Sequence, residues 1–332
     1  MFRYSFLILL FLFPVSSYSN WQGTGTSSAP YEIWTLDDLN ALADSINTRN
    51  FYGRNLHFKL MADIDTFKNV IGHNNPTILH RWNHHFDGNG HTITVAIYGR
   101  GLFGFADKNS VIRNLNIDGV VSGLSEVGGF VGTNFGLIQN CTNYASVYAT
   151  EWSGAIVGFN IGTVIGCHNY GTMTSNSFYI GGIVGVNNEH ILECVNAGYV
   201  IGGNDVGGIV GRISSFAQSS VTIEYVTANN LNIGSVEGGN RIGGIVGDIL
   251  MNNNLFVLVS NNTNSGFIKG DNSVGGIIGR VFNNTTISNN FNSGVVQSNL
   301  QNVGCIIAIK GTGANIIIEN NHYDKQMCGE ED

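Results

Sequence analysis

A short glycine-containing block that recurs along the chain constrains its fold more than any other feature. The block first reads VGGFVG at residues 127–132, and later copies read IGGIVG, VGGIVG and VGGIIG before a degenerate copy, VGCIIA. The leading glycines lie 26 to 36 residues apart and are Gly128, Gly154, Gly181, Gly207, Gly243, Gly275 and Gly304. Repetition on this length scale indicates stacked structural repeats, none of which buries enough apolar surface to fold alone.

The sequence between the blocks predicts β-strands. Apolar runs of three to five residues alternate with Gly, Asn and Ser, as in residues 137–147 and 287–296. Short runs bounded by turn residues are typical of strands, and none reaches the length of a 3.6-period helix. Circuits of such strands that stack at about 4.8 Å form a parallel β-solenoid. We therefore predict an all-β protein, a right-handed parallel β-helix with one short N-terminal capping helix.

Stacking in register converts fixed offsets in the sequence into columns of side chains. Thirteen residues after their leading glycines lie three cysteines that we expect to be buried free thiols: Cys141, Cys167 and Cys194. Fifteen residues after the same glycines lie three asparagines: Asn143, Asn169 and Asn196. Both columns are predicted to be structural ladders inside the turns. The pattern extends the asparagine ladder to Asn264 and Asn292, with Thr227 as an interruption.

The glycine block followed by an N-x-G turn resembles the GLUG-motif repeats of secreted and surface β-helical proteins. The LMADID and FDGNGHTI segments resemble the first coils of the broader class of pectin-lyase-like β-helices. The resemblance covers about residues 30–328 and implies extracellular display and adhesion, without a particular reaction. Some immunoglobulin A proteases carry such repeats beside a zinc protease domain. The 332 residues contain no HExxH motif, so that activity does not carry over.

Pattern and composition divide the chain into five segments. These are a signal peptide (1–19), a lead-in with the N-terminal capping helix (20–50), irregular early coils (51–126), the repeat solenoid (127–321) and a polar C-terminal tail (322–332). Arg3, an apolar run at residues 6–13 and a small-x-small site mark the signal peptide. The capping helix begins at Thr35, which has capping-box spacing to Asp38. Its predicted apolar face is Leu36, Leu39, Leu42, Ala43 and Ile46.

Other sequence features bear on the compartment and the chain ends. No later apolar run is long enough to span a bilayer, so we expect a secreted, extracellular protein without a transmembrane segment. Five cysteines are an odd number for an exported protein, and Cys328 is a candidate for pairing with another chain. The two longest repeats predict protruding loops near residues 213–222 and 249–258, and we expect the tail to fray.

The early coils hold the best candidates for chemistry. Asp63, Asp65 and Asp87 are the carboxylates that an enzyme of the pectin-lyase-like class would need on adjacent coils. His80, His84 and His85 are close together, and we expect a polar surface loop there rather than a metal site. The sequence indicates no cofactor, no metal and no catalytic group. A net charge of −8 without a basic stripe argues against a nucleic-acid partner.

The repeats supply the candidate binding residues. Arg212, Asp248 and Arg280 each follow a glycine block, so they form either a salt-bridge ladder or a docking point for a carboxylate or sulfate. Tyr144 and Tyr170 fall on adjacent coils with Trp152 nearby, and they either close the turns or bind a glycan or protein. Sequons for N-glycosylation occur at Asn140, Asn261, Asn283 and Asn284.

Three functions remain open from these observations. The first is non-enzymatic adhesion to an extracellular glycan or protein along a repeated face. The second is a carbohydrate-active β-helix enzyme, which requires Asp63, Asp65, Asp87 and His84 or His85 to converge in one cleft. The third is a passive coat or spacer, in which the rods could also associate end to end.

Overall fold

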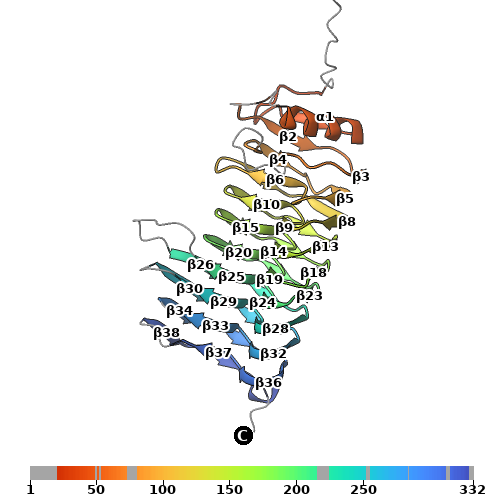
Figure 1. The fold of residues 1–332 in the computed structure, drawn as a ribbon. Helices are drawn as coiled ribbons and strands as arrows, with labels where there is room; N and C mark the ends of the chain where they lie inside the picture. Colours follow the sequence, from red (N-terminus) through yellow and green to blue (C-terminus); the bar gives the residue numbers. More distant parts are fainter. Residues whose placement is uncertain are drawn as a thin grey trace, which may run out of the picture.

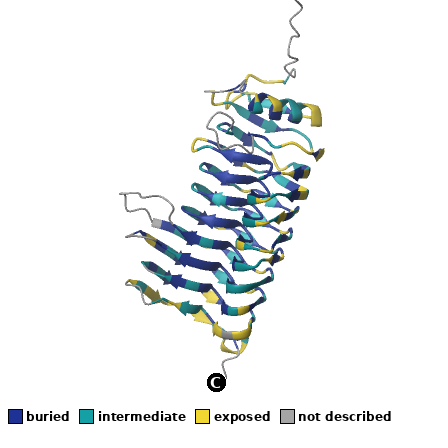
Figure 2. Cartoon of the chain, viewed as in Figure 1, coloured by how far each residue is buried: buried dark blue, intermediate teal, exposed yellow. Residues whose placement is uncertain are grey.

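The computed structural model describes residues 21–48, 51, 54–72, 81–214, 224–251, 255–282, 284–311 and 315–328. These residues form a parallel β-solenoid whose coils stack below one helix, α1 (Leu36–Asn47), as Figure 1 shows. The prediction of a nearly all-β protein built on a parallel solenoid is confirmed. Apolar side chains from the stacked coils form one continuous core. Buried positions recur from coil to coil along the rod (Figure 2).

Three parallel sheets run along the rod, and each coil from β6 (Phe103–Ala106) onward contributes to the second sheet as well as to the other two. The first sheet has eleven strands: β1 (Tyr31–Ile33), β2 (His57–Leu60), β4 (His85–Asp87), β7 (Val111–Arg113), β11 (Leu137–Gln139), β16 (Thr163–Ile165), β21 (His190–Leu192), β26 (Glu224–Ala228), β30 (Phe256–Ser260), β34 (Thr285–Ser288) and β38 (Ile316–Glu319). The second sheet has eight: β6 (Phe103–Ala106), β10 (Val131–Asn134), β15 (Val157–Asn160), β20 (Val184–Asn187), β25 (Val210–Ser214), β29 (Val246–Leu250), β33 (Ile278–Phe282) and β37 (Ile307–Lys310).

The third sheet has twenty strands because most coils contribute two or three short ones. They are β3 (Ile64–Phe67), β5 (Thr92–Tyr98), β8 (Asn116–Ser122), β9 (Ser125–Gly128), β12 (Thr142–Asn143), β13 (Ser146–Ala149), β14 (Glu151–Gly154), β17 (His168–Asn169), β18 (Met173–Ser175), β19 (Phe178–Gly181), β22 (Val195–Asn196), β23 (Val200–Ile201), β24 (Asn204–Gly207), β27 (Leu231–Asn232), β28 (Val236–Gly243), β31 (Thr263–Asn264), β32 (Ile268–Gly275), β35 (Phe291–Asn292), β36 (Val296–Gly304) and β39 (His322–Tyr323).

The glycine block occupies the corner between the third and second sheets. The leading glycines pair directly from coil to coil, as in Gly154 with Gly181 and Gly207 with Gly243. A Cβ on Gly181 would lie 1.9 Å from the carbonyl oxygen of Val184, so no larger residue fits this corner. The block recurs because the backbone turns here so tightly that its own carbonyl fills the side-chain position.

An uninterrupted asparagine ladder runs inside the third sheet. Six side-chain amides each donate or accept at 2.7–2.8 Å along the column Asn143, Asn169, Asn196, Asn232, Asn264 and Asn292. The expectation that Thr227 interrupts this column was wrong, because β26 places Thr227 in the first sheet, opposite Ile191. The sequence analysis did not find Asn232, because the repeat that begins at Gly207 is longer and places this residue beyond the offset of the shorter repeats. Each amide also bonds the turn backbone, so the ladder fixes both stacking and turn shape.

The cysteine column continues as a second asparagine ladder. Cys141, Cys167 and Cys194 are free and fully buried, and burial raises the pKa of the Cys141 and Cys194 thiols. The backbone N–H of Cys194 donates to Asn230, and the column then continues through amide pairs at 2.9 Å: Asn230, Asn262, Asn290 and Asn321. The same interior column therefore changes from thiols to amides between two coils.

The coils have left-handed backbone at two corners, the second of them only from Glu126 onward. The first corner follows the first sheet and is mostly asparagine: Asn89, Asn114, Asn140, Gly166, Glu193, Asn229, Asn261, Asn289 and Asn320. Asparagine and glycine are the residues that adopt positive φ at least cost. The second corner precedes the glycine block and carries larger side chains: Glu126, Trp152, Tyr179, Asp205, Arg241, Ser273 and Asn302. Positive φ is uncommon in such residues because it costs free energy. Its recurrence at this corner indicates that the side chains there make contacts that offset the cost.

Helix α1 covers the N-terminal end of the rod. Thr35 caps it through a complete capping box with Asp38, as the sequence predicted. Leu39, Leu42 and Ala43 are fully buried, whereas Leu36 is 37% exposed and lies outside the apolar face that we expected for it. The helix is also tied to the next turn, since the Asn47 amide donates to the carbonyl of Val70.

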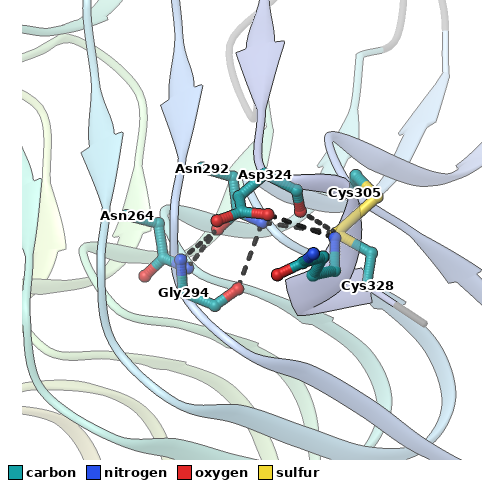
Figure 3. The surroundings of a disulfide bond; sticks show 7 residues. Asn264, Asn292, Gly294, Cys305, Asp324 and Cys328 are labelled. Atoms are coloured by element: carbon teal, nitrogen blue, oxygen red, sulfur yellow. Dashed lines mark hydrogen bonds between the residues drawn. A yellow bond between two sulfur atoms is a disulfide. The ribbon is translucent and has the colours of Figure 1, made fainter. Parts of the chain in front are cut away.

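The C-terminal coil corrects two expectations. Cys328 forms a disulfide with Cys305 of the same chain, 23 residues away, so it is not available to another chain (Figure 3). The tail does not fray over its described part, because β39 pairs with β35 and a 3₁₀ helix, η2 (Lys325–Cys328), follows. Of the loop expected near residues 213–222, only Ile213 and Ser214 are described, and both belong to β25, so this loop stays a prediction. Of the loop expected near residues 249–258, the two ends belong to β29 and β30, and residues 252–254 lie outside the described part.

Candidate ligand-binding surfaces

The outer side of the third sheet carries a group of half-exposed tyrosines, here called the tyrosine surface. Tyr144 and Tyr170 lie on adjacent coils, where their ring centroids are 5.4 Å apart and their planes differ by 12°. Both side chains follow members of the asparagine ladder, which fixes the positions of their backbones. Three further tyrosines are 47% to 73% exposed in the same sheet or beside it: Tyr98, Tyr148 and Tyr199.

The stacked pair ends at a step in the surface. The backbone of Ala197 occupies the position of Tyr170 on the next coil, and Ile233 occupies it on the coil after that. Because Ala197 is small, one face of the Tyr170 ring stacks on Tyr144 and the opposite face has no aromatic ring from the described residues of the next coil beside it. The imidazole of His168 packs edge-on against Tyr170 with centroids 6.2 Å apart. The pair therefore presents rigid, partly apolar area with polar groups at its rim.

Trp152 does not belong to the tyrosine surface. It lies in the second left-handed corner and packs against Phe159 and Tyr179, with centroids 6.1 Å and 5.9 Å away. The guanidinium of Arg212 lies over the ring of Tyr179 at 4.7 Å and donates to its hydroxyl. Trp152 and Arg212, which the sequence treated separately, therefore both contact Tyr179. We call this row of side chains along the second left-handed corner the corner stripe.

The charged residues of the corner stripe pair with one another. Asp248 is fully buried, its oxygens accept from Arg280 at 2.7 and 2.9 Å, and the Arg212 guanidinium lies 3.7 Å away. Arg212, Asp248 and Arg280 are consecutive partners in the second sheet, which is the register expected for a ladder. Buried charges that pair with each other leave few donors for a ligand, so this geometry favours the salt-bridge ladder. Docking of an external anion here stays a prediction.

A second ion pair in the corner stripe was missed by the sequence analysis. Arg241 and Asp205 form a bidentate pair across one coil spacing, and only 2% of the Asp205 side chain is exposed. Burial raises the pKa of Asp205, while the bond from Arg241 opposes that shift. The signal was present, because Glu126, Trp152, Tyr179, Asp205 and Arg241 each lie two residues before a leading glycine.

The carboxylates of the enzyme hypothesis lie at two different sheets. Asp63 precedes β3 and Asp65 lies within it, so both belong to the third-sheet side of the rod. Asp63 accepts from the backbone of Thr92 and from His91, and these bonds lower its pKa. Asp87 lies in the first sheet and is paired with Arg113 at 2.9 Å. General acid and base catalysis on a glycosidic bond needs two carboxyl groups on either side of the same bond. Asp63 and Asp87 are instead each engaged by a neighbouring basic side chain, His91 and Arg113.

The histidines also differ from the expected surface loop. His84 is 1% exposed, its Nδ1 accepts from the backbone N–H of Leu56, and burial lowers its pKa to about 4. The neighbouring ring of Trp82 is fully buried as well. His80 lies outside the described residues. Within the described part of the chain, no group of three or more His, Cys, Asp or Glu side chains is arranged to hold a metal ion.

The sequons have different settings. Asn140 and Asn261 are exposed in the first left-handed corner, and Asn284 is half-buried next to Asn315, whose amide donates to it at 3.4 Å. Asn283 lies outside the described residues. No helix in the described part of the chain has the length and apolar character needed to cross a membrane.

Comparison with known proteins gives the class of fold and two partial relatives. No protein-family model matches the chain. A solved structure, a "putative immunoglobulin A1 protease" from Bacteroides ovatus, superposes with a TM-score of 0.53 over 91% of this chain and 86% of that one. The sequences are 19% identical, so the likeness shows a shared β-solenoid fold and nothing about activity.

The sequence relatives are much longer proteins. A "Putative Gly-rich membrane protein" from Evansella cellulosilytica is 34% identical over 137 residues, which are 36% of this chain and 15% of that protein. Halomucin from Haloquadratum walsbyi is 31% identical over 151 residues, which are 38% of this chain and 2% of that protein. The chain therefore resembles a small portion of each protein, and neither match defines its family.

Proposed function

We propose that this chain is a surface-associated β-solenoid that binds an extracellular glycan through the tyrosine surface, without catalysing a reaction. The observation that carries the proposal is the stacked, half-exposed pair Tyr144 and Tyr170 on a rigid ladder. Tyrosine supplies a large contact area with few rotatable bonds, so little entropy is lost on binding. The names of the two partial relatives, a membrane protein and a halomucin, and the resemblance to GLUG-motif repeats support placement at a cell surface.

A glycan fits this surface better than a compact ligand. Tyr144 and Tyr170 lie on successive coils, which are about 4.8 Å apart, so a polymer lying along the rod meets both rings in turn and then Ala197 and Ile233. Several weak contacts between one polymer and the rod give a higher overall affinity than any single contact. A non-enzymatic role is supported by the partners that already engage two of the candidate carboxylates, His91 at Asp63 and Arg113 at Asp87.

Retardation in gels that contain different neutral and acidic polysaccharides tests the proposal. The purified chain should be retarded by at least one polymer, and Tyr144→Ala with Tyr170→Ala should weaken this binding roughly tenfold or more, as expected for a central aromatic contact. The matched control is Phe256→Ala with Phe291→Ala, which removes two rings of similar exposure (45% and 43%) from other columns.

Three results would count against the proposal. Equal binding by both double variants would remove the tyrosine surface from the interaction. Release of sugars from the same panel would support the enzyme alternative. Absence of retardation by every polymer, with attachment to protein-coated surfaces instead, would favour a protein ligand.

A further inference from the structure

A groove in the first sheet, distinct from the tyrosine surface, has the features of a small-ligand site. It has a volume of about 470 Å³ and lies between the lead-in segment and the outer side of β2, β4 and β7. Ligand pockets of this size, a few hundred cubic ångströms, hold molecules of about the size of one sugar. Its described lining includes Ser27, Ser28, His57, Lys59, His85 and Arg113.

Two imidazoles form the floor of this groove. His57 and His85 are direct partners in the pairing of β2 with β4, and their rings are stacked with centroids 4.2 Å apart and planes 7° apart. Burial, together with the charge of Arg113, lowers the pKa of both. Two neutral imidazoles can stack closely, whereas two imidazolium ions in the same place repel each other unless an anion lies between or beside them.

The fixed charges around the floor favour an anion. Lys59 forms no ion pair with any described residue, although its side chain is half-buried. Arg113 uses its Nε and one terminal nitrogen on Asp87, which leaves other guanidinium donors for a ligand. The two serine hydroxyls stand on the opposite wall and supply neutral donors.

Asp87 is the one carboxylate among the described lining residues, and its lone pairs are already in use. One oxygen accepts from the backbone of Asn89 and from the Asn114 amide, and the other accepts from Arg113. The groove thus contains one neutralised carboxylate, one remaining ammonium group and two imidazoles that can take up protons.

We propose that this groove binds a small oxyanion, the carboxylate, sulfate or phosphate group of a sugar-sized ligand, between Lys59, Arg113 and the His57–His85 pair. Binding is coupled to proton uptake, because the anion relieves the repulsion between the two charged rings. The charged and titratable groups around the pair are Lys59 on β2, Asp87 on β4 and Arg113 on β7, with His84 adjacent in the chain. Glu32 on β1 is the strand partner of Lys59, and its carboxylate accepts from the Trp34 indole. Affinity therefore rises as the pH falls through the histidine range.

Isothermal titration calorimetry of the whole chain tests this site with four probes: inorganic sulfate, inorganic phosphate, glucuronate and glucose. Sulfate, phosphate or glucuronate should bind more tightly at pH 5.5 than at pH 7.5, and glucose should not bind. The three anions distinguish a sulfate, a phosphate and a sugar carboxylate as the preferred group. Lys59→Gln should weaken binding about tenfold, as expected for loss of a charge-assisted hydrogen bond. The control Lys68→Gln, at an exposed lysine outside the groove, should leave it unchanged.

A second measurement does not depend on any variant. Saturating sulfate should raise the pKa values of both His57 and His85 in an NMR titration of the imidazole C–H signals. Unmoved pKa values, or equal affinity in Lys59→Gln and Lys68→Gln, would overturn the proposal. The Tyr144→Ala, Tyr170→Ala variant should retain the full sulfate response, so failure of glycan binding at the tyrosine surface and failure of this site are distinguishable.

Discussion

The two ends of the solenoid are closed by different means. At the N-terminal end α1 buries Leu39, Leu42 and Ala43 against the first coils, beneath which lies a cluster of large aromatic side chains. At the C-terminal end the described residues provide only η2, which the Cys305–Cys328 disulfide holds against the last coil (Figure 3). Ile317 and Ile318 remain 52% and 44% exposed there, and exposed positions gather on this coil in Figure 2.

This difference shows how a rod with one kind of repeat can have two kinds of end. A solenoid has an unsatisfied strand edge and an uncovered core at each end, and both must be dealt with locally because each coil contacts only its neighbours. At the N-terminal end, burial of apolar side chains under α1 stabilises the first coils without a covalent bond. A disulfide instead restricts the unfolded chain, so the coil needs less apolar cover. Each end should therefore respond to a different perturbation.

The largest effect is expected from the helix core. Leu42→Ala removes a fully buried side chain, and such substitutions cost about 2–5 kcal/mol. Unfolding in denaturant, followed by tryptophan fluorescence, should report the loss because Trp21, Trp34 and Trp82 all lie near this end. Leu36→Ala is the control, since Leu36 is 37% exposed and its loss should cost far less. Equal costs for the two variants would mean that α1 does not cover the core.

Reduction should act at the opposite end. The disulfide closes a loop of 23 residues, and the chain-entropy estimate for a loop of that length is about 3 kcal/mol. Hydrogen exchange should speed up in β36 to β39 after reduction, with β1 to β5 unchanged. The variant with Cys305→Ala and Cys328→Ala should exchange like the reduced protein and show no further response to reductant. Faster exchange along the whole rod would contradict the local role of this bond.

Acid should weaken the N-terminal end selectively. The folded-state pKa of His84 is lowered to about 4, so between about pH 6.5 and pH 4 the unfolded chain binds a proton that the folded chain does not. Stability is therefore highest above pH 6.5 and falls as the pH falls, by up to about 3 kcal/mol once both states are protonated. His84→Gln should flatten this dependence in fluorescence-monitored unfolding. A variant with the parent's pH slope would assign the acid sensitivity to another group.

The smallest effect is expected from the helix cap. Thr35→Ala removes the side chain that accepts from the Asp38 backbone, which typically costs about 1 kcal/mol. Thr35→Ser keeps the acceptor and should recover most of this loss. The measurement is the same unfolding experiment, and an unchanged midpoint for Thr35→Ala would show that the cap does not limit the stability of the N-terminal end.

The sequence was most informative where the period is regular. The Cys and Asn columns could be read from offsets because three successive repeats differ in length by one residue. The same arithmetic failed at Asn232, since the extra residues of the long repeat fall before the ladder position and moved it beyond the expected offset. Trp152 was grouped with Tyr144 by closeness in sequence, although a coil corner separates them and Trp152 packs toward Tyr179.

The early coils gave the weakest predictions, for a physical reason. They lack the glycine block, so nothing in residues 51–100 indicates which positions are partners. The stacking of His57 on His85 depends on the register of β2 against β4, and burial of His84 depends on the aromatic cluster around it. These contacts join residues about 28 positions apart without any repeated motif between them.

The sequence by itself determined the solenoid, the period of its coils, the capping helix and the interior ladders, because each depends on a local pattern repeated along the chain. Only the tertiary structure decided which outward-facing side chains meet. It placed Asp87 in a different sheet from Asp63 and Asp65, and it joined Trp152 to Arg212 through Tyr179. It also decided one buried contact, the pairing of Cys305 with Cys328. Outward side chains carry no periodic constraint, so their neighbours are set by the register and corner geometry of the coils beside them.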